Sequence, residues 1–305
     1  MLTRRGFLAS SLAASGLGLY PVGIEPLLVT MVTRYRVAPQ VWPAGLKLNV
    51  AVLADIHACE PWMTVERIEA IVHATNALNA DVTVLLGDYV AGHKKITGIV
   101  PDQAWARALA RLRAPLGVYA ILGNHDWWAD PVAQTLGHGP IAARKALESV
   151  GVPVFENDRI RLSKDGRSFW LVGLGDQLAF YGPRALSLGR SGVDDLTHAL
   201  AGIPAEDPVI LMIHEPDIFP QVPNRVAITL AGHTHGGQVR ILGYAPLAPS
   251  PLSRRYLYGQ FFEQGRRLIV SGGLGCSWWP VRFGAPPEIV LVEIGASDDA
   301  GRLAT

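Results

Sequence analysis

Five short polar motifs in this sequence each follow an apolar run and carry side chains that can bind metal ions. In chain order they are Asp55-Ile56-His57, Gly87-Asp88, Gly123-Asn124-His125-Asp126, His214, and Gly232-His233-Thr234-His235-Gly236-Gly237. Any one of them alone is as easily a turn or a helix cap. Because ligands of open α/β sheets bind beyond the carboxyl ends of the strands, the five together predict one shared metal site.

The spacing within two of the motifs predicts paired ligands. In an extended chain, residues i and i+2 point to the same side, so Asp55 and His57 can hold one ion together, as can His233 and His235. Imidazole, carboxylate and amide together suit Zn, Mn or Fe better than Ca or Mg, which prefer all-oxygen shells. The candidate ligands outnumber the four or so that one ion needs, so two ions that share a carboxylate would use them all.

Alternating strands and helices are expected to position these motifs. Apolar runs predict strands at residues 46–54, 81–86, 117–122, 159–162, 169–174, 209–213, 226–230, 267–270 and 288–294. Helical spacing predicts helices at residues 64–78, 102–112, 141–150 and 194–201. This order implies an α/β fold whose sheet is at least partly parallel. We expect one catalytic domain over residues 46–294 and a flexible tail over 296–305.

Residues 1–32 have the features of a targeting segment. Arg4 and Arg5 precede a mildly apolar run of small residues, which resembles a twin-arginine export signal. The stretch from Leu8 to Val32 is long enough to span a bilayer, but one glutamate and two prolines weaken it as a transmembrane helix. We expect export to the periplasm or to the outer face of the cytoplasmic membrane, with a cleaved signal or an uncleaved anchor. An ordinary N-terminal tail is the alternative.

The composition excludes several classes of protein. The chain has 27 basic and 26 acidic residues, and 49% of its residues are hydrophobic. These values rule out intrinsic disorder and argue against a nucleic-acid partner, which would require a basic excess or patch. Two cysteines, Cys59 and Cys276, could form one bridge but not a disulfide framework. The low charge persists when residues 1–32 are set aside, which fits a catalytic domain that works at a membrane surface.

In this order, the five motifs resemble those of the calcineurin-like metallophosphoesterases, over residues 50–237. The resemblance implies a four-layer α/β sandwich of two mixed β-sheets flanked by helices. It implies that Asp88 bridges two divalent metal ions, one held by Asp55, His57, Asp88 and His235 and the other by Asp88, Asn124, His214 and His233. It further implies that His125 lies near the leaving group and that Asp126 orients or tunes His125.

A narrower resemblance covers the C-terminal part of the chain. Residues 233–238, 256–259, 270–275, 280–283 and 287–289 look like those of exported or membrane-anchored phosphodiesterases, which often carry twin-arginine signals. That branch contains enzymes similar to the lipid A pathway hydrolase of UDP-2,3-diacylglucosamine. One departure is the segment Cys59-Glu60-Pro61, which stands where small residues are commoner.

Together these features predict a hydrolase of phosphoester or pyrophosphate bonds. Two ions about 3.5–4 Å apart can clamp the attacking and leaving oxygens, with a metal-bridging hydroxide that attacks phosphorus. His125 would offset phosphoryl charge or protonate the leaving group. The expected substrate is an envelope or lipid-linked ester of the UDP-diacylglucosamine type. Trp127, Trp128 and Arg282 are weak candidates for substrate contacts, since each could equally be an ordinary packing or surface residue.

Two other functions stay open at this point. A broad-specificity phosphodiesterase or phosphatase that acts on small soluble esters would use the same ligands. A metal-binding envelope protein without turnover would also keep them, although the complete ligand set and the pair His125-Asp126 argue against it. The sequence does not choose among Mn, Zn and Fe, and it gives no indication of the oligomeric state.

Overall fold

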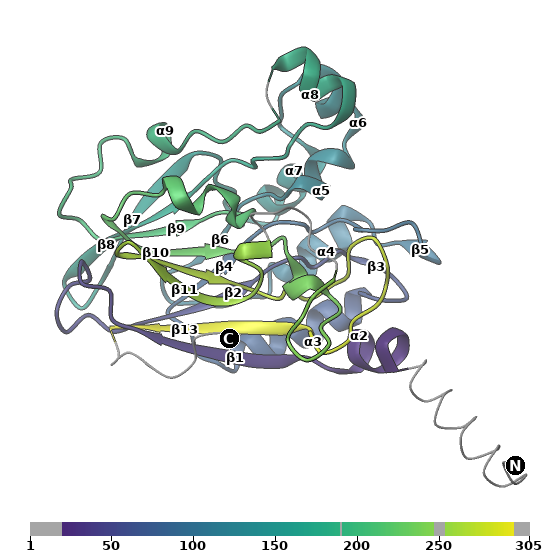
Figure 1. The fold of residues 1–305 in the computed structure, drawn as a ribbon, viewed down its shortest axis with the longest axis horizontal. Coiled ribbons are helices and arrows are strands. Elements are labelled where there is room, and N and C mark those ends of the chain that lie inside the picture. Colours follow the sequence, from purple (N-terminus) through teal and green to yellow (C-terminus); the bar gives the residue numbers. More distant parts are fainter. Residues whose placement is uncertain (1–19, 190, 247–253, 296–305) are drawn as a thin grey trace, which may run out of the picture.

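The chain forms two mixed β-sheets that pack face to face, with helices on their outer faces (Figure 1). The computed structural model describes residues 20–189, 191–246 and 254–295. The twin arginines of the expected signal and the expected tail at 296–305 lie outside these ranges. Within them, no helix combines the length and the apolar character that crossing a bilayer requires.

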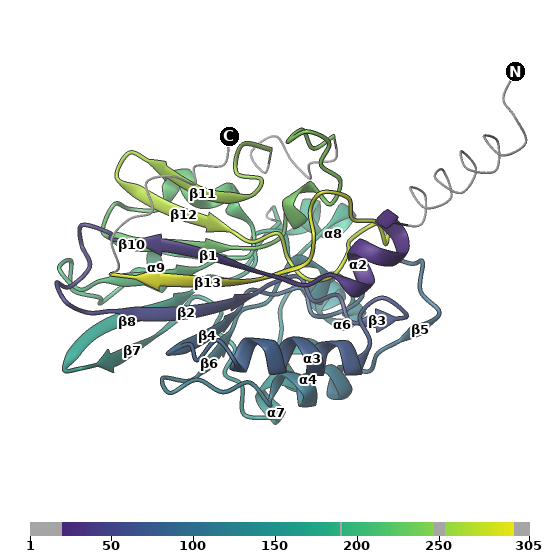
Figure 2. The same cartoon turned by 90° about the horizontal axis from the view of Figure 1, so that it is seen from below.

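The first sheet carries three of the five motifs. Its strands, in spatial order, are β1 (Met31–Val37), β13 (Glu288–Ile294), β2 (Leu48–Leu53), β4 (Val82–Leu85) and β6 (Val118–Ala120). All neighbours are parallel except β13 and β2. The outer face is covered by α3 (Val65–Asn76), α4 (Asp102–Leu109) and α7 (Ala142–Ser149) (Figure 2). The first turn of α3 is capped by Thr64, because Thr64 Oγ1 accepts a hydrogen bond from Arg67 N at 3.3 Å.

The second sheet carries the other two motifs. In spatial order it contains β11 (Gly259–Glu263), β12 (Arg266–Val270), β10 (Val226–Ala231), β9 (Val209–Met212), β8 (Arg167–Gly173) and β7 (Asp158–Lys164). The four central strands are parallel, and β11 and β7 are antiparallel edge strands. Helix α9 (Leu196–Leu200) and the 3-10 helix η2 (Pro216–Gln221) pack on its outer face.

The core between the sheets explains why the central strands are continuously apolar. Every residue of β9 and β10 is buried, as expected for parallel strands that are covered on both faces. On the inner faces, Val50 and Val52 of the first sheet share one cluster with Ile210 and Met212 of the second. Helices, sheet, sheet and helices make four layers, so the fold that the resemblance implies is confirmed.

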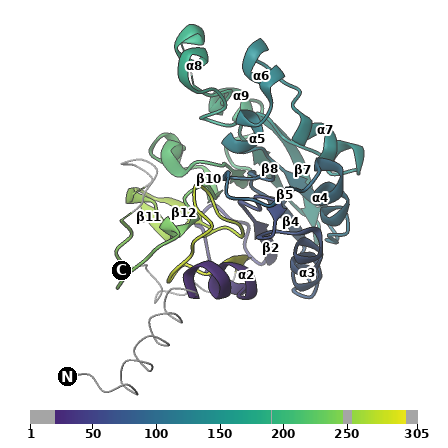
Figure 3. The ribbon, with the colours of Figure 1, turned by 90° about the vertical axis from the view of Figure 1, so that its right-hand side faces the viewer.

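Short elements complete the structure around the carboxyl ends of the strands. They are β3 (Cys59–Glu60), β5 (Gly98–Ile99), α5 (Asn124–Trp128), α6 (Pro131–Leu136), α8 (Gly182–Leu188) and η3 (His235–Gly237). Figure 3 shows α6 and α8 projecting side by side beyond α5. Cys59 and Cys276 are both buried and unpaired.

The folded part of the chain begins earlier than the expected boundary at residue 46. Strand β1 pairs with β13 along its whole length, and its inward residues Tyr35 and Val37 are buried. Before it lie the π-helix η1 (Tyr20–Ile24) and α2 (Glu25–Leu28). The stretch from Leu8 to Val32, which could have formed an anchor, therefore ends in the short helix α2 and the start of the edge strand β1.

The segment 20–28 is tied to the loop that precedes β13, as Figure 2 shows for α2. Glu25 is only 2% exposed. Its carboxylate accepts hydrogen bonds from the backbone N–H groups of Gly284 at 3.0 Å and Ala285 at 2.8 Å. Pro21 O accepts a third from Arg282 N at 2.8 Å. These contacts make the segment part of the domain.

The Glu25→Ala substitution is expected to destabilise the protein by about 1–3 kcal/mol, since it leaves two buried backbone donors without an acceptor. Chemical denaturation measures this loss. The matched control is Glu206→Ala at an exposed position, where a change within about 0.5 kcal/mol is expected. Equal unfolding free energies for the two variants would contradict the structural role of residues 20–28.

Candidate dinuclear metal site

The five motifs leave the carboxyl ends of β2, β4, β6, β9 and β10 and meet at one edge of the sandwich. Within each sheet these strands are parallel, so their carboxyl ends lie on the same side. The structure thus brings together all seven side chains that the sequence singles out as ligands, from strands as far apart in the chain as β2 and β10.

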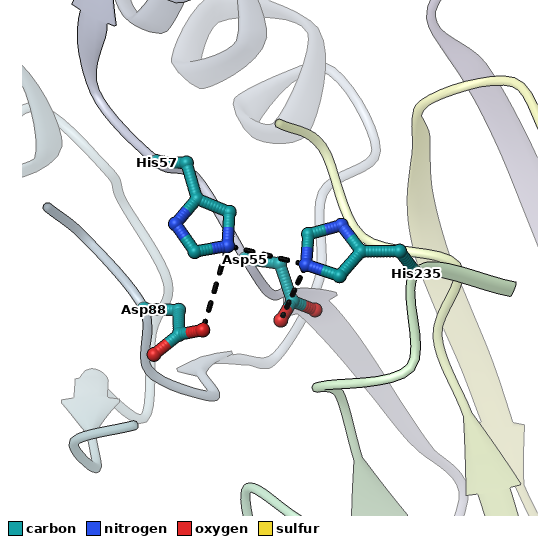
Figure 4. A group of neighbouring side chains, drawn as sticks. All are labelled: Asp55, His57, Asp88 and His235. Atoms are coloured by element: carbon teal, nitrogen blue, oxygen red, sulfur yellow. Dashed lines mark hydrogen bonds and ion pairs between the residues drawn. The ribbon is translucent and has the colours of Figure 1, made fainter. Parts of the chain in front are cut away.

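The first ligand group contains Asp55, His57, Asp88 and His235, all of them buried. One possible ligand atom from each lies within 4.8 Å of the others. His57 Nε2 is 3.1 Å from His235 Nε2 and 3.4 Å from Asp88 Oδ2. His235 Nε2 is 3.6 Å from Asp55 Oδ1. Figure 4 shows the two imidazole rings and the two carboxylates turned toward one another, which is the arrangement of a shell around a cation.

The second ligand group shares Asp88 with the first. His214 Nε2 lies 3.3 Å from Asp88 Oδ2, the same oxygen that faces His57. His233 Nδ1 lies 3.0 Å from Asn124 Oδ1. Asp88 Oδ2 therefore lies between the two groups. Glu215, which the sequence analysis did not single out, also places a carboxylate oxygen within 4.8 Å of ligand atoms of His214 and His233.

Backbone carbonyls fix the protonation of two ligand rings. His57 Nδ1 lies 2.9 Å from Val90 O, and His214 Nδ1 lies 2.6 Å from Leu86 O. Because a carbonyl only accepts, each Nδ1 carries a proton and donates it, so Nε2 is the nitrogen that can bind a cation when the ring is neutral. His214 Nε2 has no hydrogen-bond partner among the described residues and is buried. A cation would satisfy it.

Burial sets the charge of the ligands. It lowers the pKa of both His57 and His233 to about 3, so both rings are neutral near pH 7 and can bind a metal ion. Burial raises the pKa of Asp55, and a neighbouring cation would restore the charged form. Burial alone would lower the pKa of His214, but the Asp88 carboxylate raises it. A divalent cation beside Asp88 would therefore compete with a proton on His214 for this space.

The ligand-bearing loops are not extended. Positive φ angles occur at Asp55 (54°), His57 (48°), Asp88 (58°), His233 (69°) and His235 (52°). Residues other than glycine rarely adopt this left-handed conformation, and it concentrates at functional sites. The expectation that each pair shares a side because the chain is extended is wrong. Tight left-handed turns aim the side chains instead.

His125 lies beside the shared carboxylate. Its backbone N–H donates to Asp88 Oδ1 at 2.9 Å, and its ring centroid is 5.0 Å from that of His57. Burial lowers the pKa of His125, which favours the neutral ring. Its Nε2 lies 3.1 Å from the hydroxyl of Ser277. No sequence motif points to Ser277, which follows the glycine cluster at 272–275 and belongs to no ligand motif.

Asp126 contacts the backbone of the metal-site loop. Its carboxylate accepts hydrogen bonds from the N–H groups of Asp88 at 2.9 Å, Tyr89 at 2.8 Å and Val90 at 3.3 Å in that loop. It also accepts one from Gly123 N at 3.0 Å in its own turn. Its hydrogen-bond partners among the described residues are these backbone groups and not the His125 ring, so Asp126 holds the loop that presents Asp88.

Two of the three candidate substrate contacts are engaged in packing inside the domain. Trp127 is 1% exposed and packs against Phe180. Arg282 is fully buried, donates to the carbonyls of Gly272, Gly275 and Ala285, and places Nη2 3.3 Å from His235 Nδ1. Its guanidinium is therefore already hydrogen-bonded to backbone carbonyls and packed against the His235 ring. Trp128 is half-buried, with its ring 5.1 Å from that of His125.

The His125→Ala substitution is expected to lower kcat by about 10²–10⁴-fold, the range for one group in acid–base catalysis, and to leave the metal content intact. Steady-state kinetics and elemental analysis measure the two effects. His138→Ala is the control, because His138 is exposed. An unchanged kcat would remove His125 from the reaction, and a parallel loss of metal would make it a ligand.

The fold and the ligand arrangement define a metallophosphoesterase, and the family comparison agrees. Residues 48–237 match the model of the calcineurin-like phosphoesterase family. The chain belongs to this family and is a hydrolase of phosphoester bonds.

Several known proteins are similar to most or nearly all of the chain. It is 26% identical to the uncharacterized metallophosphoesterase YkuE of Bacillus subtilis, over 97% of this chain and 99% of that one. It is 27% identical to the phosphodiesterase YaeI of Escherichia coli, over 96% and 100%. The UDP-2,3-diacylglucosamine pyrophosphatase LpxG of Chlamydia trachomatis is 27% identical, over 71% and 74%. Among solved structures, a dimetal phosphatase from Danio rerio matches with a TM-score of 0.38 at 14% identity, over 74% and 88%.

Proposed function

We propose that this protein uses two divalent ions to hydrolyse an amphipathic phosphoester or pyrophosphate in the cell envelope. The observation that carries the two-ion proposal is the position of Asp88 Oδ2, 3.4 Å from His57 Nε2 and 3.3 Å from His214 Nε2. Asp55 and His235 complete the first site, and Asn124 and His233 complete the second. Mn, Zn or Fe fits this mixture of nitrogen and oxygen ligands.

Bound ions would supply Lewis-acid polarisation of the phosphoryl group and a water whose proton is lost near neutral pH. The chain supplies the rest of the chemistry. Asp126 fixes the Asp88 loop through hydrogen bonds from the backbone N–H groups of Asp88, Tyr89 and Val90, so the shared carboxylate does not reorganise during the reaction. His125, held by Asp88 through its backbone N–H, presents its ring to the phosphoryl or leaving-group oxygen.

An amphipathic substrate is supported by exposed indole rings near His125. Ser277, which contacts the His125 ring, is followed by Trp278 and Trp279, which are 76% and 56% exposed. Indole rings suit a substrate that has both an apolar and a polar part. The name of the relative LpxG points to a UDP-diacylglucosamine-type substrate. The name of YaeI fits the second candidate, a phosphodiesterase of broader specificity.

We propose export by a twin-arginine pathway, on the strength of Arg4 and Arg5 and the mild apolar run that follows. If a signal is removed, we expect the cut to precede Tyr20, because residues 20–28 pack on the domain through Glu25 and Pro21. Sequencing the N-terminus of the mature protein tests both points.

Parallel assays of the full chain test the substrate. One uses detergent-solubilised UDP-2,3-diacylglucosamine and the other bis-(p-nitrophenyl) phosphate, both with added Mn²⁺. The proposal expects a kcat/KM at least tenfold higher for the lipid-linked pyrophosphate. Efficient hydrolysis of the simple diester alone would favour the broader phosphodiesterase, and no hydrolysis of either would favour a binding protein.

A further inference from the structure

His93 is a buried histidine that the proposed mechanism leaves unused. It follows Asp88 by five residues, on the loop between β4 and β5, and is 8% exposed. Its Nε2 is buried and has no hydrogen-bond partner among the described residues. His93 belongs to neither group of possible metal ligands. A buried polar atom without a partner is unusual in a folded protein and calls for an explanation.

The backbone fixes which nitrogen of His93 carries the proton. Lys95 N lies 3.2 Å from His93 Nδ1 and donates to it. Because that nitrogen accepts, the neutral ring carries its proton on Nε2. Burial, with His125 as the second cause, lowers the pKa of His93, so the neutral ring is the form present near pH 7. His93 therefore offers one N–H donor for which the described part of the chain provides no acceptor.

The loop that carries His93 forms a wall of the catalytic centre. Gly92 forms a parallel bridge with Ser277, and Trp278 N donates to Gly92 O at 3.1 Å. A Cβ built on Gly92 would lie 2.7 Å from His57 Nδ1, so the loop passes directly against a metal ligand. Ser277 in turn contacts the His125 ring.

We propose that His93 Nε2–H donates a hydrogen bond to a phosphoryl oxygen of the substrate, on the side of the site formed by His125 and Ser277. This proposal rests on the proposed function, because a phosphoester supplies the acceptor. Phosphoryl oxygens are strong hydrogen-bond acceptors. A neutral N–H group can donate a hydrogen bond to such an anion without transferring its proton. Lys95, whose Nζ lies 5.3 Å from the ring centroid of Trp279, adds a cation to the same rim, which suits a substrate with a second phosphate.

Two polar substitutions of His93 test the Nε2–H donor separately from the hydrogen bond that Nδ1 accepts. In His93→Asn the short amide keeps an acceptor for Lys95 N–H but has no donor where Nε2 lies. In His93→Gln the longer amide returns an N–H group near the Nε2 position. The exposed His73, substituted as His73→Asn, is the control. The measurements are KM and kcat for bis-(p-nitrophenyl) phosphate, the inhibition constant of inorganic phosphate, and the metal content.

We expect His93→Asn to raise KM and the phosphate inhibition constant by about ten- to a hundredfold, the value of one hydrogen bond to a charged group. The metal content should not change, and His93→Gln should recover most of the loss. Unchanged constants in His93→Asn, with an active wild-type protein, would overturn the role of His93 and leave the proposed function standing. If the wild-type protein hydrolyses nothing, the proposed function fails. Phosphate binding to the Mn²⁺-loaded variants, measured by calorimetry, then decides the His93 proposal by itself.

Discussion

The Asp88→Asn variant is expected to lose hydrolytic activity by about a thousandfold or more and to bind less than the full complement of metal. Asp88 Oδ2 faces His57 Nε2 at 3.4 Å and His214 Nε2 at 3.3 Å, so one oxygen belongs to both ligand groups. The amide is nearly isosteric with the carboxylate but carries no charge. Metal ions contribute several kcal/mol of transition-state stabilisation, and each 1.36 kcal/mol is a factor of ten in rate.

The assay compares kcat/KM on bis-(p-nitrophenyl) phosphate with the metal content per chain. Asp165→Asn is the matched control, since Asp165 is exposed and its positive φ of 52° suits asparagine as well as aspartate. Wild-type activity in Asp88→Asn would show that no shared carboxylate is needed, and the two-ion arrangement would have to be abandoned.

The Gly123→Ala variant is expected to lose about a hundredfold or more in activity through the addition of one methyl group. A Cβ at this position would lie 2.4 Å from Asp88 Oδ1 and 2.6 Å from His214 Cε1. Both atoms belong to ligand side chains of the second group, and a buried, close-packed site has no room for them to move away. Displacing catalytic groups by about 1 Å is enough for a loss of this size.

Gly23→Ala is the matched control, because it adds the same methyl group at a position where a Cβ meets no atom within 4 Å. Activity and metal content should drop together in Gly123→Ala while far-ultraviolet circular dichroism stays unchanged. Normal activity in this variant would show that the close approach of Gly123, Asp88 and His214 is not needed for catalysis.

The sequence predicts the location of the site well because chemistry and topology agree at these positions. Apolar runs long enough for buried strands end at Asp55, Asp88, Asn124, His214 and His233, and parallel strands must present these ends at one edge. Strand β13 (Glu288–Ile294) likewise forms where its apolar run predicts it. Local pattern decides such features, so one sequence is enough to find them.

Features that depend on tertiary packing were not predictable in the same way. Arg282 and Trp127 carry surface or interface side-chain types, yet both are buried by segments distant in the chain. Ser277 and His93 belong to no spacing pattern, and the bridge between Gly92 and Ser277 brings their two segments together. Strand β1 does show alternating burial, but the apolar residues before it favoured a targeting segment. Only the pairing of β1 with β13 shows that this part of the chain is a strand of the domain.

The most direct test of the central claim is the metal stoichiometry of the wild-type chain together with its dependence on metal for hydrolysis. The protein is stripped with a chelator, titrated with Mn²⁺ and assayed on bis-(p-nitrophenyl) phosphate at each step, with bound metal counted by elemental analysis. The two ligand groups that share Asp88 predict no activity in the stripped protein and full activity at two ions per chain. Undiminished hydrolysis in the stripped protein, or saturation of activity at one ion, would contradict the account.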